Sequence, residues 1–142
     1  MFTHFSHVGI VVRDMDAAIE RWTLAYGLHV LDRYDVDEEG VRAAILAAGA
    51  TGTTGTCIEL IEPMDPTDLT NAIARRLAAV GEGVYHLAFH VDNPDNPIHQ
   101  TTGSGSIPLI ESLPSAPRYE KRSIIHPRYA NGVLIELLGP SL

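Results

Sequence analysis

The chain has 142 residues, of which 45% are hydrophobic and 20% are charged, and this composition is typical of one ordinary globular domain. Ten basic residues stand against 18 acidic ones, and the net charge of −8 argues against binding to the phosphate backbone of nucleic acid. A single cysteine, Cys57, excludes an intramolecular disulfide and a thiolate metal cluster. No apolar run approaches the roughly 18 residues of a membrane span. The first residues lack the pattern of a secretory signal, so we expect a cytoplasmic protein.

The predicted elements of the first half follow the order βαβββ. Alternating apolar and β-branched residues predict a strand over residues 3–12. Asp14 is a suitable N-cap for a helix over residues 15–26, and Gly27 ends it. The apolar face of that helix is expected to contain Ala17, Ile19, Trp22 and Leu24. Three further strands are predicted over residues 28–34, 41–47 and 56–61.

The second half repeats the first. HVGIVVRDMD (residues 7–16) corresponds to HLAFHVDNPD (residues 86–95), and the two leading histidines are 79 residues apart. IELIEP (residues 58–63) corresponds to IELLGP (residues 135–140), with the two glutamates 77 residues apart. Two matches at nearly one spacing and in the same order indicate two homologous modules.

The repeat predicts the domain organisation. The modules cover residues 1–64 and 82–142, and a helical connector over residues 65–81 joins them within one compact domain. The connector helix itself is predicted over residues 66–80 and ends at Gly81. In the second module, a degraded helix is expected among strands over residues 84–91, 107–112, 121–125 and 133–138. We therefore expect an α+β fold in which two βαβββ modules form one curved mixed sheet of about eight strands.

Each module carries one histidine on its first strand and one glutamate on its last. Because side chains alternate along a strand, His7 and Glu59 are predicted to point away from the apolar faces of their strands, as are His86 and Glu136. A lone histidine or glutamate at such a position is usually either exposed to solvent or buried with hydrogen-bond partners in the core. Their matched recurrence instead favours a metal site, because two imidazoles and two carboxylates suit a divalent first-row metal with room for substrate oxygens.

Other polar residues are weaker candidates. His90 lies two residues beyond His86 on the same predicted face, where it either transfers protons or lines the site. Basic residues gather before the last strand. Arg118, Lys121 and Arg122 form a candidate site for a substrate carboxylate or phosphate, and the alternative is an ordinary solvated turn.

Several segments together resemble the vicinal-oxygen-chelate superfamily, which includes glyoxalase I, methylmalonyl-CoA epimerase, extradiol dioxygenases and bleomycin-resistance proteins. These segments are HVGIVVRDMDAAI, CIELIEP, GVYHLAFHV and HPRYANGVLIELLGP, and the epimerase branch is the most similar. The resemblance implies one divalent ion (Zn, Co, Ni, Mn or Fe) held by His7, Glu59, His86 and Glu136. It also implies a homodimer.

The reaction implied by the resemblance is removal of a proton next to a carbonyl, as in an isomerase or epimerase, with a metal-stabilised enolate. The substrate is a small molecule such as an acyl-CoA, and Glu59, Glu136 and His90 are the candidate proton-transfer residues. One departure concerns Ala43, because some epimerases of this branch carry a glutamate there. The alternatives are a glyoxalase I-like lyase, another enzyme of the superfamily with a specialised substrate, and a metal-free binding or resistance protein.

Overall fold

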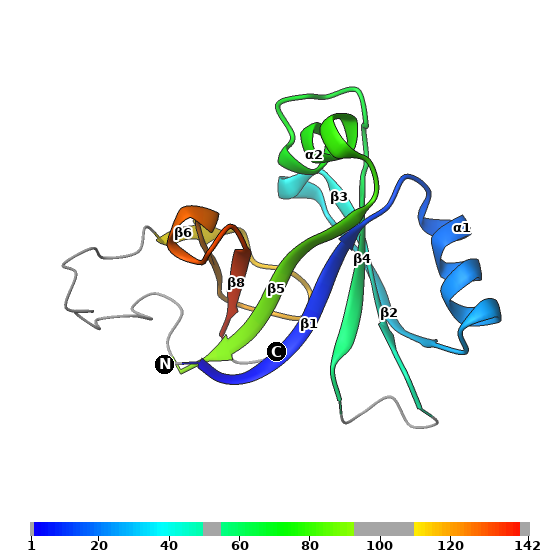
Figure 1. Ribbon diagram of the computed structural model, residues 1–142, viewed down its shortest axis with the longest axis horizontal. Coiled ribbons are helices and arrows are strands. Elements are labelled where there is room, and N and C mark those ends of the chain that lie inside the picture. Colours follow the sequence, from blue (N-terminus) through cyan, green and yellow to red (C-terminus); the bar gives the residue numbers. More distant parts are fainter. Residues whose placement is uncertain (1, 50–54, 93–109, 140–142) are drawn as a thin grey trace. The chain divides into compact units, whose positions relative to one another are not determined.

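The computed structural model describes residues 2–49, 55–92 and 110–139. The strands are β1 (Phe2–Val11), β2 (His29–Val36), β3 (Val41–Ala47), β4 (Cys57–Pro63), β5 (Gly83–Val91), β6 (Ile110–Leu113), β7 (Arg122–Ile125) and β8 (Leu134–Leu138) (Figure 1). The helices are α1 (Met15–Glu20) and α2 (Ala72–Val80), with short helical turns η1 (Arg21–Ala25), η2 (Asp37–Glu39) and η3 (Pro127–Tyr129). Within the described ranges, the helices are too short and too polar to span a lipid bilayer.

These strands form one eight-stranded mixed sheet in the order β2-β3-β4-β1-β5-β8-β7-β6. β1 is parallel to β4, and β5 is parallel to β8. The pairs β2–β3, β3–β4, β6–β7 and β7–β8 are antiparallel. The predicted α+β class and single mixed sheet are confirmed. The helix predicted for the second module falls on residues 93–109, which lie outside the described ranges.

The chain divides into two compact units, His7–Tyr85 and a second unit made of Met1–Ser6 and His86–Leu142. The first residues of β1 belong to the second unit because their side chains contact β5. Phe2 stacks on Phe89 with ring centroids 4.7 Å apart, and the Thr3 hydroxyl donates a hydrogen bond to a β5 carbonyl at 3.0 Å. The boundaries predicted from the repeat, 1–64, 65–81 and 82–142, stay a prediction.

In the first unit, α1 packs on β3 and β4 through one helix face (Figure 1). This face consists of Met15, Ala18 and Ile19 and continues to Trp22 of η1, so that the four residues follow the i, i+3, i+4, i+7 spacing of a helix stripe. They contact a buried cluster formed by Val12, Ala44, Leu46 and Leu60. The predicted face was wrong at Ala17 and Leu24, which are exposed because they lie off this stripe. The N-cap prediction is confirmed, since the Asp14 carboxylate accepts from the amide of Ala17 at 3.0 Å.

The helix predicted over residues 66–80 begins later than expected. Asp65 and Asp68 each accept hydrogen bonds from the amide and hydroxyl of the threonine two residues later, and these local bonds compete with helix formation. The hydroxyl and amide of Thr67 also lower the pKa of Asp65. Asn71 then caps α2 by accepting from the amides of its first turn at 2.9 and 3.1 Å.

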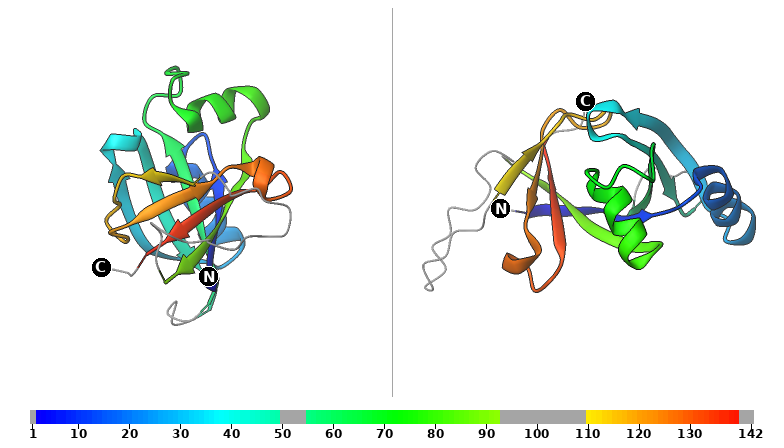
Figure 2. Two further views of the ribbon diagram at one scale, coloured as in Figure 1. Left: turned by 90° about the vertical axis from the view of Figure 1, so that its left-hand side faces the viewer. Right: turned by 90° about the horizontal axis from the view of Figure 1, so that it is seen from above.

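The second unit shows the alternation predicted for β5. Its strands β6, β7 and β8 lie side by side in the left view of Figure 2. One face joins Leu87, Phe89 and Val91 of β5 to Ile125, Ile135 and Leu137. On the other face, Ala88 packs with Tyr119 and Leu138. The predicted orientation of β5 is confirmed, and the face that carries Ala88 also carries His86 because side chains alternate.

Shortening Leu60 to alanine is expected to lower the free energy of unfolding by about 2–5 kcal/mol, because the fully buried side chain leaves a cavity under α1. Leu24→Ala is the matched control, since its side chain is 79% exposed, and its expected change is within about 0.5 kcal/mol. Urea denaturation of both variants measures the difference. Equal losses of stability would contradict this description of the core.

Candidate metal centre

The first histidine–glutamate pair lies on the parallel strands β1 and β4. His7 is level with Cys57 in the strand register, so Glu59 lies two residues farther along on the same face. Both residues are buried, with 1% and 6% of their surface exposed. The Nε2 atom of His7 lies 3.2 Å from Oε2 of Glu59. The remaining carboxylate oxygen, Oε1, accepts a hydrogen bond from the Tyr34 hydroxyl at 3.0 Å.

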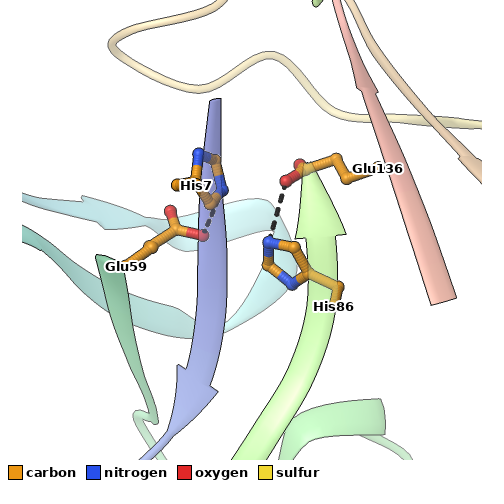
Figure 3. A group of neighbouring side chains, drawn as sticks. All are labelled: His7, Glu59, His86 and Glu136. Carbon is orange, nitrogen blue, oxygen red and sulfur yellow. Dashed lines mark ion pairs between the residues drawn. The ribbon is translucent and has the colours of Figure 1, made fainter. Parts of the chain in front are cut away.

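The second pair repeats this construction on the parallel strands β5 and β8. His86 is level with Leu134, so Glu136 again lies two residues farther along. Both side chains are buried, and Nε2 of His86 lies 3.1 Å from Oε2 of Glu136. Arg122 of β7 holds Oε1 of this carboxylate, with Nε at 2.8 Å and a terminal nitrogen at 2.7 Å. Figure 3 shows the ion pair within each of the two sets.

Strand parity predicted the two pairs correctly, but two of their partners were missed. Tyr34 stands opposite Ala43, which in turn stands opposite Ile61, so all three share the face of Glu59. Arg122 stands opposite Leu138, which places it on the face of Glu136. The guanidinium of Arg122 contacts the Glu136 carboxylate, and its predicted contact with substrate stays a prediction. The missing signal was the antiparallel register of the neighbouring strands.

The other predicted site residues differ in burial and in their ring contacts. His90 is half-buried and stacks on His4 with ring centroids 4.3 Å apart, while the edge contact of its ring with Tyr119 is at 5.9 Å. Lys121 is exposed, and Arg118 is half-buried in the segment before β7. Their predicted roles in proton transfer and anion binding stay predictions.

The donor atoms of each pair suit a divalent ion. Two ligand atoms that bind one ion at about 2.0–2.2 Å lie roughly 3 Å apart for a right angle and about 3.5 Å apart for a tetrahedral angle. The Nε2–Oε2 distances of 3.2 and 3.1 Å fall in this range. Imidazole nitrogen and carboxylate oxygen are both ligands of first-row divalent metals. Each pair therefore fits half of a mixed nitrogen and oxygen coordination shell.

The fold and these pairs define an α+β protein with a duplicated, strand-borne histidine–glutamate pair. A family model for the Glyoxalase/Bleomycin resistance protein/Dioxygenase superfamily matches residues 6–121. The chain belongs to this superfamily. A search of curated protein sequences finds no match.

Solved structures add more specific similarities. Methylmalonyl-CoA epimerase from Mycobacterium tuberculosis is 30% identical with a TM-score of 0.80, over 99% of this chain and 90% of that one. A Streptomyces coelicolor methylmalonyl-CoA epimerase variant in complex with 2-nitronate-propionyl-CoA is 29% identical with a TM-score of 0.76, over 98% of both chains. A hypothetical protein from Bacillus halodurans is 27% identical with a TM-score of 0.79, over 96% of this chain and 94% of that one.

Glu136→Gln is expected to lower the free energy of unfolding by about 3–5 kcal/mol, because the largely buried guanidinium of Arg122 then lacks its carboxylate. The measurement is denaturation in the presence of a chelator, so that metal binding does not contribute. Asp16→Asn provides the control, since it removes the exposed 2.8 Å ion pair with Arg33 and should change stability by less than about 1 kcal/mol. A loss for Glu136→Gln no larger than that of the control would contradict the pairing.

Proposed function

We propose that this protein is a metal-dependent epimerase that removes and returns the proton next to the carbonyl of an acyl-CoA. The duplicated, buried histidine–glutamate pair is the observation that carries the proposal. Among the similar solved structures are methylmalonyl-CoA epimerases in complex with methylmalonyl-CoA or with 2-nitronate-propionyl-CoA, and these complexes support this substrate class. The proposal therefore has three parts, which are the binding of a metal ion, the epimerase reaction and the acyl-CoA substrate.

In this proposal, His7, Glu59, His86 and Glu136 hold one divalent ion together. Either pair alone supplies only two ligand atoms, whereas a first-row divalent ion binds four to six. Two neutral imidazoles and two carboxylates also balance the charge of the ion. When bound, the ion supplies the positive charge that favours negative charge on the substrate carbonyl oxygen.

The proton transfers are assigned to side chains of the chain itself. Because Ala43 has no ionisable group, the base is Glu59, Glu136 or His90. The base accepts the proton from the carbon next to the carbonyl, and a second group returns a proton to the opposite face of that carbon. Arg118 and Lys121 are proposed to bind the anionic groups of the substrate. The homodimer and the cytoplasmic location stay predictions.

A glyoxalase I-like lyase is the second candidate. The superfamily to which the chain belongs carries glyoxalase in its name, and the histidine–glutamate pairs suit that reaction equally well. Both reactions begin by removing a proton from the carbon atom next to a carbonyl group. The substrate therefore distinguishes them, because the lyase acts on the hemithioacetal of a thiol and a 2-oxoaldehyde.

The metal-loaded protein is expected to exchange the α-proton of methylmalonyl-CoA with deuterium in D2O. Proton NMR follows the loss of the α-proton signal against a blank without protein. His86→Ala should slow the exchange by at least about 100-fold, because it removes a ligand of the ion that stabilises the developing charge. His126→Ala is the matched control, since His126 is exposed and caps η3 instead.

Parallel samples contain the hemithioacetal of methylglyoxal and glutathione. Formation of the lactate thioester, without exchange of the acyl-CoA proton, would replace the epimerase by the lyase. Inertness of the folded, metal-loaded protein toward both substrates would contradict the proposed function.

A further inference from the structure

We infer that Arg122 and Tyr34 are positioning residues that make Glu136 and Glu59 each offer a single oxygen, Oε2, to the metal ion. This inference rests on the proposed function, because it requires that the two carboxylates bind an ion. It concerns residues that touch the carboxylates rather than the substrate.

Arg122 is held rigidly enough to fix its carboxylate. Its Nε and one terminal nitrogen donate to Oε1 of Glu136 at 2.8 and 2.7 Å, and its other terminal nitrogen donates to the carbonyl of Pro114 at 3.1 Å. Only 10% of the Arg122 side chain is exposed. Charge-assisted hydrogen bonds of this kind are among the stronger ones in proteins. The guanidinium thus fixes the rotation of the carboxylate while Oε2 lies 3.1 Å from the imidazole of His86.

Tyr34 performs the corresponding function for Glu59 with a neutral donor. Its hydroxyl donates to Oε1 at 3.0 Å, while Oε2 lies 3.2 Å from the imidazole of His7. The side chain reaches Glu59 across β3, where its register partner is Ala43. A small residue at this position leaves the path between the phenol ring and Glu59 open.

In both halves the two oxygens of the glutamate carboxylate have the same kinds of neighbour, although the donor to Oε1 is a phenol in one half and a guanidinium in the other. In both, Oε1 accepts from a donor outside the pair and Oε2 lies next to the imidazole Nε2. A carboxylate binds an ion through one or two oxygens. Because Oε1 already accepts a hydrogen bond, each carboxylate is expected to bind the ion through the single oxygen Oε2. Binding through one oxygen leaves coordination positions on the ion for substrate oxygens.

Binding of Co²⁺ to the purified full chain tests the inference in two variants, Arg122→Met and Tyr34→Phe. Loss of either positioning residue is expected to weaken Co²⁺ binding by roughly 10- to 100-fold, as for other residues that orient metal ligands. The intensity of the visible Co²⁺ absorption should also fall, because a released carboxylate binds through both oxygens and raises the coordination number. Titration calorimetry and absorption spectra provide the two measurements.

Electrostatics alone predicts the opposite result for Arg122→Met. Removing a positive charge beside a cation site should tighten the binding of a cation, so weaker binding points to lost positioning. Arg122→Lys retains the charge without the planar fork of donors, and should not restore the spectrum. Arg128→Met and Tyr26→Phe are the matched controls, since both side chains are exposed and lie outside the two pairs.

The outcomes separate this inference from the proposed function. If the unmodified protein fails to bind any Co²⁺, the proposed function is wrong. If it binds Co²⁺ while Tyr34→Phe and Arg122→Met bind equally well or better with unchanged spectra, only the inference is overturned. Circular dichroism and thermal unfolding show whether each variant is folded, and Tyr34→Phe removes no more than a hydroxyl group.

Discussion

The burial of a carboxylate in each half is the constraint on which this structure depends. Glu59 and Glu136 are buried within mostly apolar strands, where an uncompensated charge would cost several kcal/mol. Each carboxylate is compensated on both oxygens, by an imidazole on one side and by a hydroxyl or guanidinium on the other. The parallel pairing of β1 with β4, and of β5 with β8, supplies the imidazole in the same register both times.

The duplication preserves the geometry of the pairs but not the charge around them. The Glu136 set contains a guanidinium that balances its carboxylate, whereas the Glu59 set contains a neutral phenol. The two carboxylates therefore carry the same ligand atoms in different electrostatic surroundings.

The sequence alone predicted those features that depend on local periodicity. Alternation along β5 and the repeat of His7 and Glu59 were sufficient to place each histidine on the face of its glutamate. The contacts of Tyr34 and Arg122 with the two glutamates escaped prediction because they depend on the register of antiparallel neighbours. In β2 that register shifts between Val30 and Asp32, which no local pattern indicates. The helix predicted over residues 66–80 begins only at Ala72, because the side chains of Asp65 and Asp68 accept hydrogen bonds from backbone amides that precede the helix.

The proposed function requires that one ion binds both histidine–glutamate pairs, and native mass spectrometry after removal and restoration of a single divalent metal tests this requirement most directly. The unmodified protein should retain one ion per chain. His7→Ala and His86→Ala should each retain none, because an ion that loses either pair keeps too few ligands. Two ions per chain, or an ion that survives the loss of one histidine but not of the other, would contradict the account.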